Sequence, residues 1–163
     1  MFVKQASTPL LPITQLPPTL KLTELVKPDD VELVRISNKI LFDREYVEAC
    51  FCMTSAIKKV DTNESVAWAM THRDLYVGAL HVLPDYRRRG LAEIILIDIT
   101  RRYIDFYKQC LPDVPLSQMY INACVESYNT PSANLFKKAG WSQIGLGKCW
   151  ICCNNIRKEN LIE

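Results

Sequence analysis

The sequence contains no long apolar run and almost no net charge. No stretch of its 163 residues approaches the roughly 20 apolar residues that a membrane-spanning helix needs, so the sequence predicts no such helix and no membrane partner. The formal net charge of +2 gives no reason to expect nucleic acid as a partner. With 48% hydrophobic and 23% charged residues, the composition is that of one globular domain with a single core.

The beginning of the sequence also lacks the pattern of a secretory signal. It holds four prolines and three lysines but no arginine before Pro28, which is untypical of a secretory or a mitochondrial signal. We therefore expect the seven cysteines to be reduced, buried and unreactive in the cytoplasm. The alternative is a zinc site on Cys50, Cys52, Cys149 and Cys152. It is disfavoured because residues 149–153 resemble a strand, in which residues three apart point to opposite faces.

Apolar periodicity predicts strands and helices in a mixed order. The Pro-rich residues 1–19 are expected to form a tail or an extended segment along an edge. Alternation predicts strands at 20–26, 55–60, 65–71, 75–83 and 118–125, with a last strand or hairpin at 141–154. Helices are predicted from Pro28, over 43–53, over 91–109, and from an N-cap at Thr130 to Gly140. Tight turns join the three strands between 55 and 83, which indicates an antiparallel meander. The predicted α/β domain covers residues 20–155, followed by a tail at 156–163.

The segment most informative about function follows the meander. A strand ends at Pro84, a short turn with three arginines follows, and a helix begins after Gly90. This order presents the free backbone N–H groups of a helix N-terminus, which bind anions. Gly90 lets the backbone approach a phosphate closely, and Ala92 is a small second neighbour. A solvated, charged loop is the alternative, but the strand–turn–helix context favours an anion site.

Two motifs resemble a known family. Arg87, Gly90 and Ala92 match the signature of the GNAT superfamily of N-acyltransferases: Arg or Gln, two residues, Gly, one residue, and Gly or Ala. Residues 129–141, with Asn129 and Ser132 at their start, resemble the C-terminal helix motif of that superfamily. Residues 46–50 and 65–68 are similar to the glycine N-acyltransferase-like branch. The resemblance covers about residues 20–150.

The resemblance implies a GNAT fold, a twisted, mixed and mostly antiparallel sheet whose two central strands splay apart, flanked by helices. Acetyl-CoA or another acyl-CoA would lie in the gap as cosubstrate, and an amine from a small molecule or a protein would attack it directly. Pantetheine would bond to the backbone near Val82 and Leu83, and pyrophosphate would sit on the amides of the turn. The implied cofactor-binding residues are Val82, Leu83, Arg87, Arg88, Arg89, Gly90, Leu91, Ala92, Asn129, Ser132 and Phe136.

The acid and base groups of the superfamily are missing at their usual positions. Phe136 stands where many members have a tyrosine acid, and Tyr76 stands where glycine N-acyltransferases have a glutamate base. The remaining catalytic candidates are Tyr76, Asp74 and Glu126. For each of the two carboxylates, the simpler interpretation is a residue at a strand end or edge with no catalytic role. His81 has a suitable pKa, but strand alternation places it on the opposite face from Tyr76 unless a bulge intervenes. A CoA-binding domain without catalysis is therefore the alternative to an active N-acyltransferase.

Overall fold

The structure of the protein, a computed structural model, describes residues 1–38 and 40–145. Its strands are β1 (Phe2–Gln5), β2 (Leu20–Thr23), β3 (Thr54–Lys59), β4 (Ser65–Thr71), β5 (Tyr76–Val82), β6 (Tyr120–Ala123) and β7 (Ser142–Gln143). Its helices are α1 (Asp29–Ser37), α2 (Arg44–Ala49), α3 (Leu91–Cys110) and α4 (Thr130–Lys138), with short 3-10 helices η1 (Cys50–Cys52), η2 (Pro84–Tyr86) and η3 (Leu116–Gln118).

The strands form a single mixed sheet. Over the described ranges, the sheet has seven strands in the order β2-β3-β4-β5-β6-β1-β7. The strands from β2 to β5 pair antiparallel with their neighbours, which confirms the predicted meander. At the centre, β5 and β6 run parallel. The mixed, mostly antiparallel sheet flanked by helices confirms the predicted fold class.

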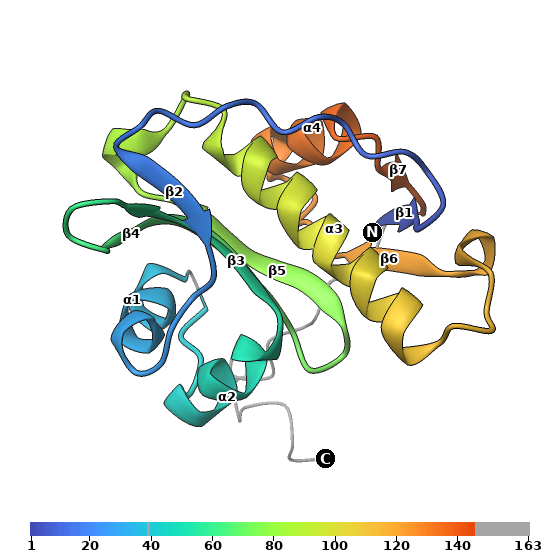
Figure 1. Cartoon of the computed structure of the whole chain (residues 1–163), viewed down its shortest axis with the longest axis horizontal. Helices are drawn as coiled ribbons and strands as arrows, with labels where there is room; N and C mark the ends of the chain where they lie inside the picture. The colour runs from blue at the N-terminus through green and yellow to red at the C-terminus, as the bar shows by residue number, and fades with distance from the viewer. Residues whose placement is uncertain (39, 146–163) are drawn as a thin grey trace, which may run out of the picture.

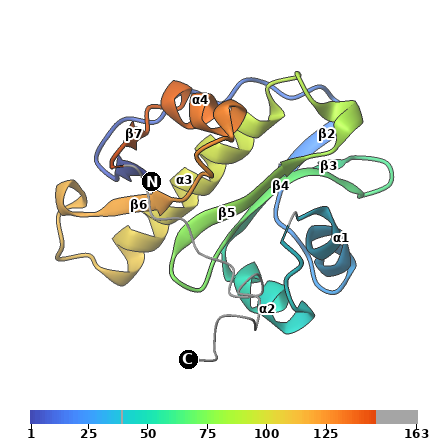
Figure 2. The same ribbon diagram turned by 180° about the vertical axis from the view of Figure 1, so that it is seen from behind.

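The helices cover the two faces of the sheet (Figures 1 and 2). In α3, apolar residues recur at helical spacing, and the buried side chains of Leu91, Ile95 and Ile99 face the sheet. The helix lies across β3, β4 and β5. Next to it, α4 buries Phe136 in the same core cluster. The opposite face packs against α1 and α2 around the fully buried Trp68.

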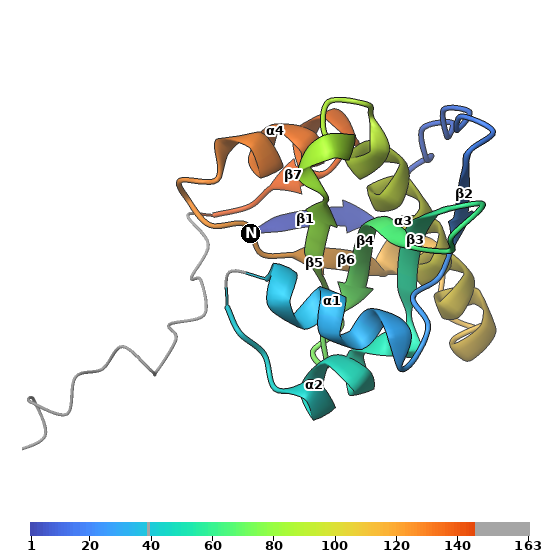
Figure 3. The ribbon, with the colours of Figure 1, turned by 90° about the vertical axis from the view of Figure 1, so that its left-hand side faces the viewer.

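The first residues of the chain are part of the sheet, contrary to the expectation of a tail or edge segment. Strand β1 lies between β6 and β7 (Figure 3), with Phe2 opposite Ala123 on one side and Gln143 on the other. The Phe2 side chain is buried, and its ring lies 5.3 Å from the ring of Phe136. The four residues of β1 show no apolar alternation in the sequence, because one of the two buried positions is Lys4, so they could not be distinguished from a tail.

Several predicted element ends need correction. The N-cap of α4 is Asn129 and not Thr130, because the Asn129 side chain accepts a hydrogen bond of 3.2 Å from the backbone N–H of Ser132. The predicted helix over 43–53 begins at Arg44 and changes to the 3-10 helix η1 at Cys50. Of the hairpin expected at 141–154, the structure contains β7. Residues 146–163, with the expected tail at 156–163, lie outside the described residues.

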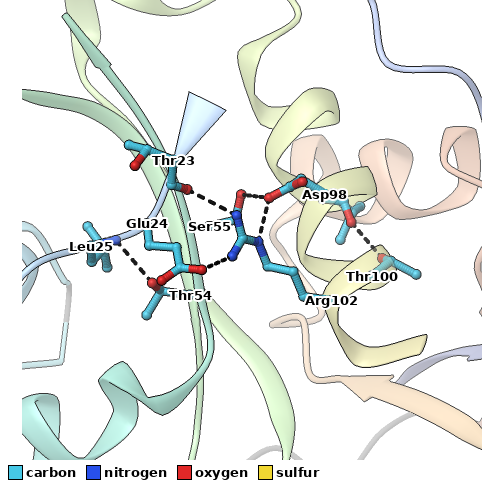
Figure 4. A network of polar contacts seen from close by, with 9 residues as sticks. Thr23, Glu24, Leu25, Thr54, Ser55, Asp98, Thr100 and Arg102 are labelled. Atoms are coloured by element: carbon cyan, nitrogen blue, oxygen red, sulfur yellow. Dashed lines mark hydrogen bonds and ion pairs between the residues drawn. The ribbon is translucent and has the colours of Figure 1, made fainter. Parts of the chain in front are cut away.

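A polar network joins α3 to the sheet (Figure 4). The carboxylate of Asp98 accepts hydrogen bonds from the Ser55 hydroxyl at 2.8 Å and from Nε of Arg102 at 2.7 Å. Arg102 also forms an ion pair with Glu24, which follows β2. Asp98 and Ser55 are both buried, so this network satisfies polar groups inside the interface between α3 and β3.

Candidate acyl-CoA site

The turn between β5 and α3 has the geometry of an anion site. Gly90 adopts the left-handed conformation with φ of 77°, and the preceding Arg88 also has a positive φ, 62°. The N–H groups of Gly90, Leu91 and Ala92 find no acceptor among the residues described. A Cβ placed on Gly90 would meet nothing within 4 Å. The turn therefore offers unpaired donors and open space at the positive end of a helix of 20 residues.

The arginines of the turn fix its shape as well as its charge. Nε of Arg87 donates to the carbonyl of Val82 at 3.0 Å, and Arg89 donates to the carbonyl of Asp85 at 2.8 Å. The Arg89 guanidinium also lies over the Tyr86 ring, 5.2 Å from its centre. These bonds tie the turn to the end of β5, so the free amides are held in place before any ligand arrives.

Strands β5 and β6 separate beside this turn (Figure 2), and we call this separation of the two backbones the gap. The two strands pair only at Tyr76 with Asn122 and at Val77 with Ala123, and they separate beyond these residues. The N–H of Leu83 donates to Val66 in β4 at 2.9 Å. Because neighbouring residues of a strand present their N–H groups to opposite edges, the N–H of Val82 faces the gap. This is the splay that the resemblance implied.

In the late helix α4, the first turn lies near the surface, whereas Phe136 lies in the core. Asn129 and Ser132 form the N-terminal cap of α4 and are partly exposed. Phe136 is 4% exposed and packs edge to face against Trp141 with a ring distance of 5.0 Å. The Phe136 ring therefore belongs to the core, and its contact with a cofactor stays a prediction.

A β-bulge changes which residues share a face with Tyr76. Trp68 lies opposite His81 and Met70 lies opposite Gly78, so two steps along β4 match three along β5. The extra residue falls at Ala79, which has φ of 50°. Because of this bulge, His81 lies on the same face as Gly78 and Tyr76. The expectation from simple alternation, which put His81 on the opposite face from Tyr76, is wrong.

The three predicted catalytic residues do not form one cluster. Tyr76 is half-buried at the point where the gap opens, and its hydroxyl donates to the sulfur of Met1 at 3.5 Å. Asp74 is exposed in the β4–β5 turn and accepts a hydrogen bond of 3.3 Å from the N–H of Tyr76. Glu126 is half-buried beyond the end of β6, and its carbonyl accepts from the N–H of Asn129 at 2.9 Å.

One group on this face was absent from the sequence candidates. The imidazole of His72, from the β4–β5 turn, lies against Gly78, and its Nδ1 is 3.0 Å from the hydroxyl of Tyr46 in α2. Burial lowers the pKa of His72, and the charge of Asp74 opposes this effect. The sequence signal that could have indicated this contact is Gly78, because a glycine inside a strand often marks a place where another group packs closely against the backbone.

The described residues hold no cluster of His, Cys, Asp or Glu that could bind a metal ion. Cys50 is buried and Cys52 is exposed, whereas Cys149 and Cys152 of the zinc alternative lie outside the described ranges. Between residues 1 and 145, apart from residue 39, no helix combines the length and the apolar character needed to cross a bilayer.

Solved structures share this architecture. A Drosophila protein superposes with a TM-score of 0.73 at 22% identity, over 88% of this chain and 46% of its own. A GCN5-related N-acetyltransferase from Sphaerobacter thermophilus superposes with a TM-score of 0.61 at 13% identity, over 86% of this chain and 46% of its own. The protein AAC(6')-Iy, in complex with the bisubstrate analogue CoA-S-monomethyl-acetylneamine, has a TM-score of 0.56 at 12% identity, over 81% and 97%. This chain thus spans less than half the length of the first two.

The mixed, mostly antiparallel sheet flanked by helices is the fold that this chain shares with these acetyltransferases. The chain belongs to the FR47-like protein family, whose model matches residues 56–151, more than half of the sequence. No curated protein matches the sequence.

Proposed function

We propose that this protein is an N-acyltransferase that moves an acetyl or other acyl group from acyl-CoA to an amine. The observation that carries the proposal is the turn at Gly90, whose free amides lie beside the gap between β5 and β6. A diphosphate would accept hydrogen bonds from these donors, and an extended chain would lie between the separated strands. The complex of AAC(6')-Iy with a CoA-linked analogue, on the same fold, supports this choice of ligand.

The cosubstrate would bind along β5 and the start of α3. Pyrophosphate oxygens would accept hydrogen bonds from the amides between Arg88 and Ala92, with the exposed Arg88 adding charge. Pantetheine would run through the gap and bond to the N–H of Val82. Asn129 and Ser132 would flank it from α4. Phe136 would support that helix from the core, which leaves the family's usual tyrosine acid without a substitute at this position.

The amine would enter from the face that α1 and α2 cover. Tyr76 lies on this face where the gap opens, so we assign it a role in positioning the acceptor. Asp74 and Glu126, on the two sides of the gap, would contribute charge. The amine would attack the thioester directly, without a covalent acyl-cysteine intermediate. A cysteine without an activating histidine has a pKa of about 8.5, so it stays mainly protonated near neutral pH and is a poor nucleophile.

The acceptor is proposed to be a small amine. The similarity of residues 46–50 and 65–68 to glycine N-acyltransferases makes amino acids the first class to test. The analogue bound to AAC(6')-Iy joins CoA to an amino sugar derivative, which makes amino sugars the second class. We place the reaction in the cytoplasm, where the exposed thiols Cys52 and Cys110 stay reduced.

Calorimetry with Gly90→Asp tests the cosubstrate site. A Cβ there meets no atom within 4 Å, although the φ of 77° strains any side chain, and the added carboxylate places negative charge beside the pyrophosphate. We expect CoA affinity to fall at least about tenfold, or about 1.4 kcal/mol. Gly145→Asp, the same change at a glycine that also has positive φ, is the control and should bind CoA normally. Equal CoA affinity of folded Gly90→Asp and the parent would contradict the proposed site.

A CoA-binding protein without catalysis is the second candidate. It is favoured by Phe136 and Tyr76, which replace the acid and base found in relatives. Release of free thiol from acetyl-CoA in the presence of a panel of amines distinguishes the two functions. Amine-dependent release supports the transferase, whereas tight CoA binding without release on any amine supports the second candidate.

A further inference from the structure

The sequence contains two histidines, and the fold brings both to the same face of the strand pair β4–β5. His72 follows β4, and His81 reaches this face because of the bulge at Ala79. Their surroundings differ. The His81 ring stacks on Trp68 at 5.0 Å with an angle of 20° between the planes, which packs it against the core under α1 and α2. His72 instead lies where β5 loses its partner strand.

The imidazole of His72 occupies the space that a side chain at Gly78 would fill. A Cβ built on Gly78 would lie 2.0 Å from Nε2 and 2.3 Å from Cδ2 of His72. Gly78 is the first residue of β5 beyond its pairing with β6, which ends at Val77. The absent side chain therefore allows the imidazole to lie against the strand backbone at the opening of the gap.

Aromatic neighbours hold this imidazole in place. The Tyr46 hydroxyl lies 3.0 Å from Nδ1, and the Phe42 ring packs edge-on at 5.6 Å. The guanidinium of Arg73 lies over the Tyr46 ring at 5.1 Å. A neutral imidazole that donates from Nδ1–H to the Tyr46 oxygen keeps the lone pair of Nε2 on the side of Gly78. Tyr46 thereby orients the ring, and the form required of a base at Nε2 is the tautomer that carries its proton on Nδ1.

Burial, and not the surrounding charges, favours the neutral form of His72 near pH 7. Burial lowers the pKa of His72, and Asp74 in the turn is the charge that opposes this shift. From α2, burial raises the pKa of Tyr46 to about 12, so its hydroxyl stays protonated. The other groups around this pair are Cys50 at the end of α2, Arg73 in the turn, and Tyr76 in β5. A neutral imidazole can accept a proton, as a general base must.

We propose that His72, oriented by Tyr46 and packed against Gly78, is the general base that accepts the proton of the attacking amine. The proposal rests on the proposed function. The amine nitrogen forms a bond to the carbonyl carbon of the thioester, and the carbon–sulfur bond breaks. The nitrogen loses one proton to Nε2 of His72, and the imidazolium returns a proton to the departing CoA sulfur or to water. This base takes the place of the carboxylate that is missing at Tyr76.

Matched substitutions at the two histidines test the proposal. With the amine that gives the fastest thiol release, His72→Gln should lower kcat/KM by about a hundredfold or more, and His81→Gln should stay within a few-fold of the parent. With rates expressed per unprotonated amine, the acidic limb of the parent pH–rate profile should disappear in His72→Gln. CoA affinity should be unchanged in both variants. A large loss confined to His81→Gln, or an acidic limb that persists in folded His72→Gln, would overturn the assignment.

Gly78→Ala provides a second variant that keeps the histidine. The added methyl group cannot coexist with the present ring position, so a folded Gly78→Ala protein should lose activity like His72→Gln while binding CoA normally. Tyr46→Phe should lower kcat with a smaller effect on KM. Near-parental activity of folded Gly78→Ala would contradict the proposal, because the imidazole would then be dispensable at this place.

NMR gives a readout that does not require turnover. With two histidines in the sequence, the ring C–H signals are assigned by single substitutions. Acetyl-CoA should shift the His72 signal, and Tyr46→Phe should change its titration. The His72 signal of the parent could be insensitive to saturating acetyl-CoA even though Gly90→Asp abolishes binding. That result would place the ring away from the acyl group and refute the assignment of His72 as the general base. Lack of turnover with a shifted His72 signal would instead count against the transferase and leave the ring beside the thioester.

Discussion

Burial determines the charge state of both histidines. For His72, burial lowers the pKa against the opposing charge of Asp74, and for His81 the positive charge of Arg87 adds to the effect of burial. Neither ring forms an ion pair within the described residues. The folded protein therefore holds two imidazoles that resist protonation, which suits a proton acceptor and makes the fold sensitive to acid.

The first prediction concerns this acid sensitivity. Because the folded pKa of each histidine lies below the unfolded value of about 6.5, the unfolded chain binds more protons as the pH falls from 6.5 towards the folded pKa. The free energy of unfolding should therefore decrease between pH 7 and pH 5. Glu32 and Glu64, whose pKa values are lowered from 4.5 by Arg35 and Lys59, add to the loss only at lower pH.

Urea unfolding at pH 7 and pH 5 measures the effect. The parent should lose stability between these two values, and the double variant His72→Gln, His81→Gln should lose clearly less. An equal decrease in both proteins would show that other groups cause the acid sensitivity.

At the scale of elements, the sequence predicts those helices, strands and turns that a local residue pattern determines. Helix α3 was predicted because its apolar residues repeat at helical spacing between Gly90 and Pro112, and the meander because alternation and tight turns agree. The free amides at Gly90 also follow from local order. The bulge at Ala79 could not be predicted, since alanine carries no signal for a positive φ. This one residue reverses the face of His81.

The contact of His72 with Gly78 could not be predicted for a different reason. It depends on how the β4–β5 turn folds back onto β5 and on Tyr46 of α2, which lies 26 residues before His72 in the chain. Such contacts form only when distant elements pack together. The turn proposed to bind the cosubstrate is one continuous segment and could be predicted from the sequence, whereas the candidate base depends on three separate segments and could not.

The second prediction concerns the network between α3 and the sheet. Asp98→Ala removes the acceptor of the buried Ser55 hydroxyl and one partner of Arg102. We expect a loss of about 2 kcal/mol in the free energy of unfolding, because a buried polar group without a partner costs about 1–3 kcal/mol. Asp105→Ala, on the exposed side of the same helix, is the control and should change stability by less than about 0.5 kcal/mol. Similar effects of the two substitutions would contradict this account of the network.

At the scale of the whole molecule, two half-sheets meet at a narrow junction. One half is the meander with β2, and the other consists of β6, β1 and β7. Their direct pairing is limited to two residues on each strand, at Tyr76–Val77 and Asn122–Ala123. Helix α3 lies across β3, β4 and β5 and also contacts α4, so it holds the halves together while the gap stays open. The shape of the gap thus depends on how well the second half is packed.

Strand β1 is central to that second half. It pairs with β6 on one side and with β7 on the other, and its Phe2 ring contacts Phe136 of α4. Without β1, strands β6 and β7 would each lose a partner and expose unpaired backbone groups. The first residues therefore support β6, which borders the gap, although they lie more than 80 residues before Gly90 in sequence.

The last prediction tests this role of the first strand. Phe2→Ala should lower the free energy of unfolding by about 3 kcal/mol, because it removes a buried aromatic ring from a packed core. Leu11→Ala is the control, since Leu11 lies nine positions later in the proline-rich segment and is 41% exposed, and it should cost less than about 0.5 kcal/mol. If residues 1–5 were a tail, both substitutions would be equally harmless in urea unfolding. Because Phe2 supports α4, Phe2→Ala should also weaken CoA binding, whereas Leu11→Ala should leave it unchanged, and calorimetry on the two folded variants separates these outcomes.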